Sequence, residues 1–278
     1  MKIAILTDSS YGGNLKDIKD LYQVPLMITE ENGGQIPDDE NLTEERFYEL
    51  LESQALKTSL TVPKTMLDMW DHLLKEYDQV IFAGLSKGLS GQFSTYRMLS
   101  ETEEKYKGKV FVIDTNGVSV ILQHLVKNVA IWIAENKTGF EIMELILKKH
   151  DKFTAFIIPK NLDTLKRGGR ITPAAAALAK MLKIIPILRY NGQIDKQTTA
   201  RTFKKAVLES LELIKKERKG VKEIDIAYSK MNPETMELIE LLLDKEGFKI
   251  NMMMKMPKVV ASHTGTETVA LIVWERGE

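Results

Sequence analysis

The chain contains no cysteine among its 278 residues. Disulfide bonds, thiolate nucleophiles and cysteine-ligated zinc are therefore excluded, and the hydrophobic core must be stable without covalent cross-links. Histidine is scarce too, and the four histidines are too far apart for metal-ligand spacing on a helix: His72, His124, His150 and His263. We therefore predict no metal site.

An excess of either charge is also missing, because 39 Lys and Arg residues balance 39 Asp and Glu residues. Without a positive field we expect no nucleic-acid partner. Apolar runs are broken by charge or proline within about ten residues, short of the roughly 20 that cross a bilayer. The amino terminus, Met1-Lys2-Ile3-Ala4-Ile5-Leu6, is typical of a buried strand and not of a signal peptide. We expect a cytoplasmic protein that is not integral to a membrane.

The length predicts two domains. In the first half, short apolar runs alternate with longer amphipathic ones, the pattern of a parallel sheet covered by helices. We predict an α/β domain of three layers over residues 1–151. Its expected elements are strands at 2–7, 79–83 and 110–113, helices at 43–53, 64–77 and from Gln92, and a surface loop at 30–41.

Each of these three strands ends in small polar residues, at 8–10, 86–91 and 114–116. The carboxyl ends of parallel strands form the ligand crevice of an open sheet, so we expect the three endings to meet at one edge. The segment 84–91, rich in glycine and hydroxyls, lies before a helix and is suited to holding an anion. The alternative is that Ser, Asp and Asn are simply common in turns.

The second half, residues 152–278, is predicted to be a mixed or antiparallel α+β domain, because Asn191-Gly192 is a strong hairpin signal. Gly168-Gly169 predicts a sharp turn with a positive φ, and Thr172 with Pro173 predicts a helix start. The expected strands are 153–159, 184–188, 224–228 and 268–274; the expected helices are 174–182, 202–217 and 233–243; and 262–266 is expected to be a polar loop carrying His263.

Seven segments together resemble the DegV family of fatty-acid-binding proteins, in an order and spacing that cover nearly the whole chain. They are Thr7-Asp8-Ser9-Ser10, Lys57-Thr58-Ser59, Leu89-Ser90-Gly91, Val112-Ile113-Asp114, 165–172 with Gly168-Gly169-Arg170, 184–188, and His263-Thr264-Gly265.

The resemblance implies a cytoplasmic carrier without catalytic activity or cofactor, in which the second domain covers the chain of a buried long-chain fatty acid. The carboxyl group would bond to Thr58 and Ser90, assisted by Ser59, Gly91 and His263. A separate fatty acid kinase, related to dihydroxyacetone kinases, would phosphorylate the bound acid for phospholipid metabolism, and the carrier would then hold the acyl phosphate. Arg170 would serve the phosphate or the kinase partner.

Two short segments depart from the family pattern. Leu60 and Thr61 stand where the family usually has glutamine and proline, so the loop beside Thr58 is expected to differ. Thr266 and Glu267 replace the usual proline and glycine after the His-Thr-Gly segment. The charge of Glu267 either weakens anion binding or points away and caps the loop.

A second function remains open, because Gly84-Leu85-Ser86-Lys87-Gly88 matches the Gly-x-Ser-x-Gly elbow of esterases, with Ser86 as nucleophile and His263 downstream. Against it, the next helix is expected to begin after Gly91, and Asp225, inside a strand, is a poor triad acid. A third hypothesis is a carrier of another amphipathic anion, since a fold does not fix its ligand.

Overall fold

The computed structural model describes residues 1–149, 151–178 and 183–275 of the chain. These residues form two compact units, each described by itself below. Unit 1 comprises Met1–Asp151 together with Pro257–Val259, and unit 2 comprises Lys152–Met256 together with the chain from Val260 onward.

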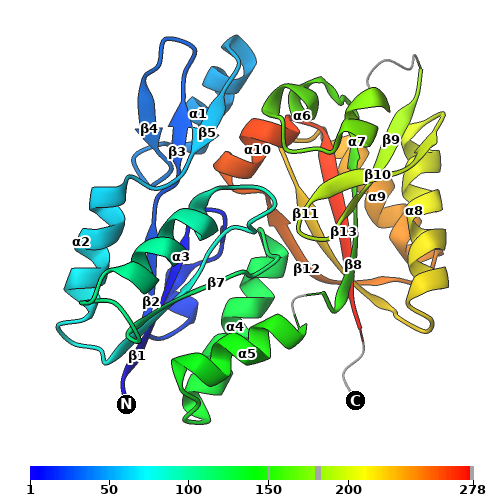
Figure 1. The fold of residues 1–278 in the computed structure, drawn as a ribbon. Helices are drawn as coiled ribbons and strands as arrows, with labels where there is room; N and C mark the ends of the chain where they lie inside the picture. The colour runs from blue at the N-terminus through cyan, green and yellow to red at the C-terminus, as the bar shows by residue number, and fades with distance from the viewer. Residues whose placement is uncertain (150, 179–182, 276–278) are drawn as a thin grey trace. The chain divides into compact units, whose positions relative to one another are not determined.

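In unit 1, strands and helices alternate from residue 35 to residue 134 (Figure 1). Its elements are β1 (Ile3–Asp8), the 3-10 helix η1 (Leu15–Asp17), β2 (Leu21–Val24), β3 (Met27–Thr29), β4 (Gln35–Pro37), α1 (Glu44–Ser53), β5 (Lys57–Ser59), α2 (Pro63–Leu73), β6 (Gln79–Ala83), α3 (Gln92–Thr102), β7 (Val110–Ile113), α4 (Val120–Ala134) and α5 (Gly139–Lys149).

The main sheet of unit 1 is parallel, with strand order β2-β1-β6-β7. Side chains alternate between its faces, as the two-residue period of a strand requires. Ile3 and Ile5 pack in one hydrophobic cluster with residues of α4 and α5. Ala4 and Leu6 pack on the other face with Trp70 of α2 and residues of α3. The prediction of a three-layer parallel domain is therefore confirmed.

A second, three-stranded antiparallel sheet with strand order β4-β3-β5 lies in unit 1. The prediction of a loop over residues 30–41 is wrong in part, because β4 pairs with β3 there. The polar composition hid this strand, since an exposed edge strand needs no apolar alternation. The short strand β5, which carries Thr58 and Ser59, was not predicted at all.

Residues 257–259 are tied to the rest of unit 1 by a partly buried ion pair. The Nζ atom of Lys258 lies 3.2 Å from Asp38 Oδ1, and the Val259 N–H donates to Asp38 Oδ2 at 3.4 Å. Burial raises the pKa of the Asp38 carboxyl, and the charge of Lys258 opposes that rise. These bonds hold the start of α10 (Lys258–Thr264).

Unit 2 is built on one six-stranded sheet with strand order β10-β9-β8-β13-β11-β12. Only the β11–β12 pair is parallel among these neighbours, so the predicted mixed α+β architecture is confirmed. Its further elements are β8 (Phe153–Pro159), α6 (Asp163–Gly168), α7 (Pro173–Ala177), β9 (Ile185–Tyr190), β10 (Ile194–Ala200), α8 (Phe203–Glu217), β11 (Glu223–Tyr228), α9 (Pro233–Lys245), β12 (Lys249–Lys255), the rest of α10, and β13 (Thr268–Trp274).

One face of this sheet packs against α8 and α9, where Phe156, Ile226 and Leu271 share a cluster with residues of both helices. Residues of alternate register, such as Ile157 and Ala227, are buried as well. The Asn191-Gly192 turn joins β9 to β10 as predicted, and Gly192 has a φ of 91°. The predicted helix at 174–182 is present as α7, and its positions 179–182 lie outside the described residues.

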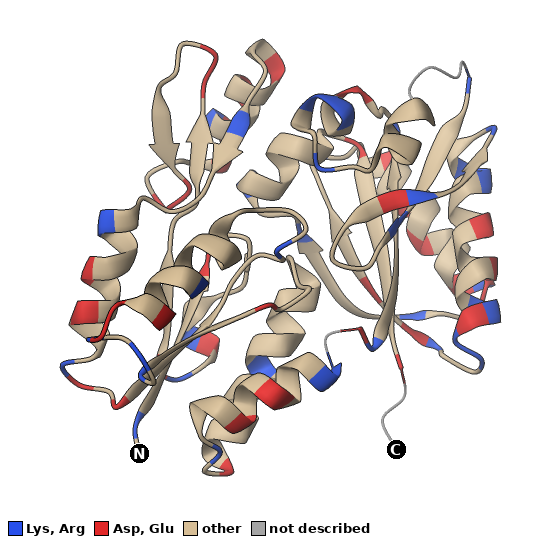
Figure 2. Ribbon diagram, viewed as in Figure 1, with Lys and Arg blue, Asp and Glu red and all other residues tan. Residues whose placement is uncertain are grey.

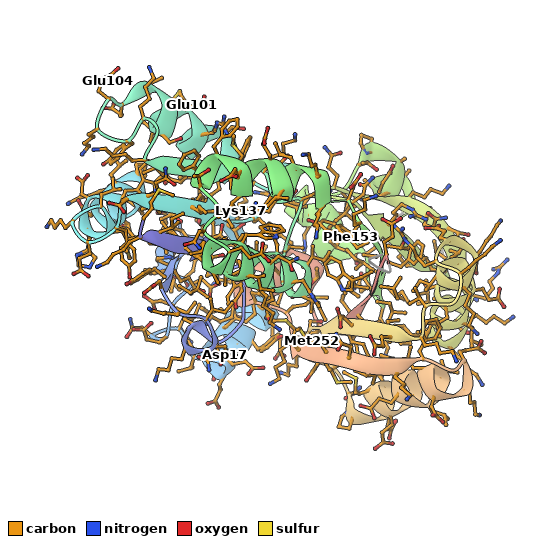
Figure 3. The ribbon with its side chains drawn as sticks, turned by 90° about the horizontal axis from the view of Figure 1, so that it is seen from below. Asp17, Glu101, Glu104, Lys137, Phe153 and Met252 are labelled. Carbon is orange, nitrogen blue, oxygen red and sulfur yellow. The ribbon has the colours of Figure 1, made fainter. Side chains whose placement is uncertain are left out.

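Acidic and basic side chains are intermixed over both units, in keeping with the balanced composition (Figure 2). Glu101 and Glu104 point outward at the end of α3, and Phe153 lies at the start of β8 (Figure 3). Phe153 stacks on Tyr190 with ring centroids 6.1 Å apart.

No helix of the described residues is long and apolar enough to cross a membrane.

Candidate functional site

The polar endings of β1, β6 and β7 do meet at one edge of the parallel sheet. Thr7 Oγ1 donates to the Ala83 carbonyl at 2.8 Å, and Thr115 Oγ1 donates to the Gly84 carbonyl at 2.6 Å. The Ser86 N–H donates to the Gly117 carbonyl at 2.9 Å. The expected convergence is confirmed, because each ending is hydrogen-bonded to its neighbour.

Asp8, at the end of β1, is the central acceptor of this edge and is fully buried. Its Oδ1 accepts from the N–H and the hydroxyl of Ser10, and its Oδ2 accepts from the Leu85 N–H at 2.8 Å and from Gln92 Nε2 at 2.9 Å. Burial raises the pKa of Asp8 and these hydrogen bonds oppose the rise. A Cβ atom at Gly84 would lie 2.5 Å from Asp8 Oδ2, so this position needs glycine.

Ser90 and Gly91 lie at the amino end of α3, where the sequence places an anion site. The Ser90 hydroxyl oxygen accepts from the Gln92 N–H at 3.2 Å, which leaves its own O–H as a donor. Gly91 is the N-cap residue, and a Cβ atom added to it would meet no heavy atom within 4 Å. A ligand oxygen can therefore approach the helix start closely.

Thr58 and Ser59 lie on β5, opposite Ile28 and Met27 of β3. The connection that follows β5 is fastened to α3 through Thr61. The Thr61 N–H donates to Gln92 Oε1 at 2.8 Å, and the Tyr96 hydroxyl donates to the Thr61 carbonyl. The buried Thr61 hydroxyl has no partner among the described residues, so the backbone of Thr61 holds this connection in place.

Ser86 lacks the geometry of a catalytic nucleophile. It is fully buried, and its Oγ accepts from the Gly88 N–H at 3.3 Å. A nucleophile elbow presents an exposed Ser at the start of a helix, whereas α3 begins at Gln92. Asp225 lies within β11, bonded to Asn251 and to the Trp274 indole. The geometry gives the esterase hypothesis no support.

The prediction that His263 lies in a polar loop is wrong, because residues 258–264 form α10. The hydroxyl-rich segment 262–266 does not indicate a helix by its composition. The helix is nevertheless formed, and the side chains of Val259 and Ala261 in it are buried. His263 is itself buried, and burial, followed by the charge of Arg170, lowers its pKa to about 4. The imidazole is therefore neutral at pH 7, and any bond that it makes to an anion carries no countercharge.

In unit 2, the structure brings the Gly168-Gly169-Arg170 segment against His263. A Cβ atom at Gly168 would lie 2.4 Å from His263 Nδ1, so the ring packs on the bare Cα of this glycine. Gly169 ends α6 with a φ of 64°, as the sequence predicts. Arg170 Nη1 donates to the Gly168 carbonyl at 2.8 Å, which turns the guanidinium back toward the helix end.

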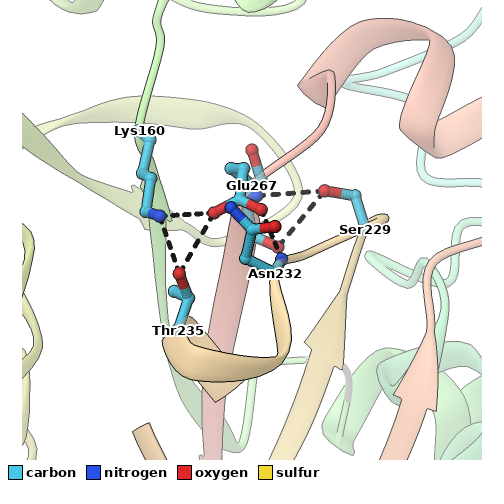
Figure 4. A network of polar contacts seen from close by, with 6 residues as sticks. Lys160, Ser229, Asn232, Thr235 and Glu267 are labelled. Carbon is cyan, nitrogen blue, oxygen red and sulfur yellow. Dashed lines mark hydrogen bonds and ion pairs between the residues drawn. The ribbon is translucent and has the colours of Figure 1, made fainter. Parts of the chain in front are cut away.

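Glu267 is fully occupied by contacts within unit 2 (Figure 4). Its carboxylate binds Lys160 Nζ, the Asn232 N–H and Thr235 Oγ1. Burial would raise its pKa, but these bonds outweigh burial and hold the pKa below its usual value. Glu267 has a φ of 55°, a strained conformation outside glycine, and the ion pair offsets that strain. Of the two alternatives for Glu267, the structure supports a capping role.

We expect Glu267→Gln to lower the free energy of unfolding by about 1 kcal/mol at pH 7, because the ion pair with Lys160 is lost. Since the folded pKa is depressed, this contribution is present above the unfolded value and disappears as pH falls through the folded value. Urea unfolding between pH 3 and pH 7 measures it. Glu240→Gln, at an exposed position of α9, is the matched control, and equal stability losses for both variants would contradict the capping role.

Among the described residues, no group of three or more His, Asp or Glu side chains could hold a metal ion. The predicted site residues of unit 1 lie on two segments: Thr58 and Ser59 on β5, and Ser90 and Gly91 at the start of α3. In unit 2, His263 lies on α10. Sequence reasoning missed Asp8 and Gln92 as organising residues. An acid directly after a buried strand was the available signal for Asp8, whereas nothing in the sequence marks Gln92.

Comparison with known proteins decides the family. A family model described as "Uncharacterised protein, DegV family" matches residues 2–276. The chain belongs to the DegV family. A DegV domain-containing protein of Ureaplasma parvum is 30% identical over 214 residues, which are 76% of this chain and 71% of the relative. Another, from Streptococcus pyogenes serotype M6, is 29% identical over 99% of this chain and 100% of its own.

Solved DegV structures share the fold over the whole length. A fatty acid binding DegV family protein from Streptococcus agalactiae superimposes with a TM-score of 0.87 at 26% identity, covering 100% of both chains. The Fatty Acid Kinase (Fak) B3 protein of Streptococcus pneumoniae, loaded with linoleic acid, has a TM-score of 0.81 at 17% identity, covering 99% of this chain and 100% of its own, and supports the fold alone.

Proposed function

We propose that this DegV protein binds a long-chain fatty acid and holds its carboxylate with uncharged donors. The observation that carries the proposal is the start of α3, where the Ser90 hydroxyl is available as a donor and Gly91 faces open space. Membership of the family and the similarity to the fatty acid binding protein of Streptococcus agalactiae support this class of ligand.

The proposed head-group donors in unit 1 are the hydroxyls of Thr58, Ser59 and Ser90 and the backbone N–H of Gly91. A carboxylate removed from water needs several donors, and neutral hydroxyls and amides supply them without a buried cation. Neutral His263 is proposed as a further donor, on the strength of the family resemblance. The head group then fixes the register of the ligand.

The acyl chain supplies most of the affinity in this proposal. Each methylene removed from water contributes about 0.8 kcal/mol, so a chain of 16 to 18 carbons suffices for tight binding. We propose, on the strength of the family resemblance, that unit 2 covers this chain. Which chain length and saturation are preferred depends on the side chains that meet the methyl end.

The test is mass spectrometry of small molecules released from the purified protein by denaturation, alongside native mass spectrometry of the intact protein. We expect one long-chain fatty acid per chain. Protein that carries no lipid and does not take up added oleate would contradict the proposal and favour another amphipathic anion.

We further propose that a separate fatty acid kinase phosphorylates the bound acid and that Arg170 serves this step. Arg170→Ala should leave oleate affinity within about threefold and slow phosphorylation by an added fatty acid kinase tenfold or more, the size of one lost charged hydrogen bond. Transfer of ³²P from ATP to bound oleate measures this rate. Arg167→Ala, exposed in the last turn of α6 and three residues before Arg170, is the matched control, and loss of oleate binding by Arg170→Ala would rule out this role.

A further inference from the structure

The two donor segments proposed for the carboxylate come from different parts of unit 1. Thr58 and Ser59 lie on an edge strand of the three-stranded sheet, whereas Ser90 and Gly91 lie between β6 and α3. One carboxylate can bond to both segments only if the distance between them is fixed within about 0.5 Å. Whatever joins the segments is therefore part of the site, even without touching a ligand.

Gln92 joins them directly. It is fully buried as the first residue of α3, its Oε1 accepts from the Thr61 N–H at 2.8 Å, and its Nε2 donates to Asp8 Oδ2 at 2.9 Å. A primary amide offers an acceptor and donors on one planar group, which a carboxylate or a hydroxyl at this position would not. The partners fix its orientation, because the Asp8 carboxylate needs a donor and the Thr61 N–H needs an acceptor.

Only a few residues separate each donor segment from the contact between Gln92 and Thr61. Thr58 lies within about 11 Å of extended backbone from Thr61, which is bonded to Gln92, and Ser90 lies within about 7 Å of extended backbone from Gln92 itself. Tyr96, one helical turn after Gln92, donates to the Thr61 carbonyl. Both backbone polar groups of Thr61 are thus held by side chains of α3.

We infer that Gln92 is a positioning residue of the head-group site: it sets the spacing between the Thr58–Ser59 segment and the Ser90–Gly91 segment, and Asp8 holds Gln92 in place. The inference rests on the proposed function, because a carboxylate spanning both segments is the reason for a fixed spacing. Gln92 is not itself a ligand of the fatty acid.

Gln92→Glu tests this with almost no change of shape. One carboxylate oxygen can still accept from the Thr61 N–H, but the other would face Asp8 Oδ2, and two carboxylates in contact must share a proton. Relative to wild type at the same pH, we expect oleate affinity to fall tenfold or more at pH 8 and to recover to within about threefold at pH 5.5. Asp8 is the titratable group in contact with residue 92, and Tyr96 contacts Thr61.

Gln92→Met keeps the volume and removes both bonds, so its oleate affinity should fall at both pH values. Oleyl alcohol, which has the same tail without the carboxylate, separates positioning from general damage: its affinity should stay within about threefold of wild type in both variants, since the tail supplies it. Gln35→Glu, exposed on β4, is the control for added charge and should bind oleate as wild type does.

The outcomes distinguish the two proposals. If wild type binds no oleate at all, the proposed function fails and the inference fails with it. If wild type binds oleate and both Gln92 variants match it at every pH, the positioning role is wrong while the function stands. Equal losses of oleate and oleyl alcohol would likewise overturn the inference, because they would show a role in folding. Should Gln92→Glu not fold, the comparison of the two ligands in Gln92→Met decides alone.

Discussion

Replacing Ser90 by alanine is expected to weaken oleate binding about 10- to 150-fold, because a hydrogen bond to a charged group contributes about 1.5 to 3 kcal/mol. The Ser90 hydroxyl accepts from the Gln92 N–H and keeps its proton for the ligand. Titration calorimetry with oleate measures the loss. Binding of oleyl alcohol should change far less, since the carboxylate is the partner that is lost.

Ser94→Ala is the matched control for this prediction, because Ser94 is an exposed serine in the first turn of α3, four residues after Ser90. Ser90→Ala also removes the acceptor of the Gln92 N–H, at a cost of about 1 kcal/mol in stability. Thermal unfolding of both variants shows whether the fold persists. Unchanged oleate affinity in a folded Ser90→Ala variant would exclude Ser90 from the head-group site.

Gly168→Ala is expected to displace the His263 ring and to lower the free energy of unfolding by about 1 to 3 kcal/mol, the usual range for overpacking. The new Cβ atom would lie 2.4 Å from His263 Nδ1. A displaced ring gains water, so the pKa of His263 should rise from about 4 toward 6.5. NMR titration of the imidazole protons and urea unfolding measure the two effects.

The lowered pKa of His263 determines how stability changes with pH. In wild type the folded state binds fewer protons than the unfolded state between pH 4 and 6.5, so His263 makes stability fall as pH drops through that window. Gly168→Ala should flatten this dependence. Gly91→Ala is the control for stability, because its Cβ atom meets nothing within 4 Å and its φ of −71° suits alanine. A His263 that still titrates near 4 in Gly168→Ala would contradict the steric argument.

Much of the fold follows from the sequence because its signals are local. The strands β6, β7, β8 and β13 have the predicted bounds, since buried strands appear as uninterrupted apolar runs. The helices α1 and α8 begin after Thr43 and Thr202, whose hydroxyls accept from backbone N–H groups of the first turn. Patterns of this kind are set within a few residues.

What the sequence could not show depends on partners that are distant along the chain. The strands β4 and β5 are exposed or half-buried throughout and three residues long, and only pairing with β3 makes them strands. The bond from Gln92 to Asp8 joins residues 84 positions apart, and no local pattern predicts it. His263 was misplaced for the same reason, because the helix that carries it is stabilised by tertiary burial more than by composition.

The ion pair between Lys258 and Asp38 has a consequence for how the chain is made. Unit 1 contains residues 257–259, so ribosomal synthesis supplies its last piece only after some hundred residues of unit 2 have emerged. Until then the Asp38 carboxylate lacks the cation and the Val259 N–H that it contacts in the finished protein. The nascent amino-terminal unit therefore completes the contacts of Asp38 only when a segment near the other end of the chain has been synthesised.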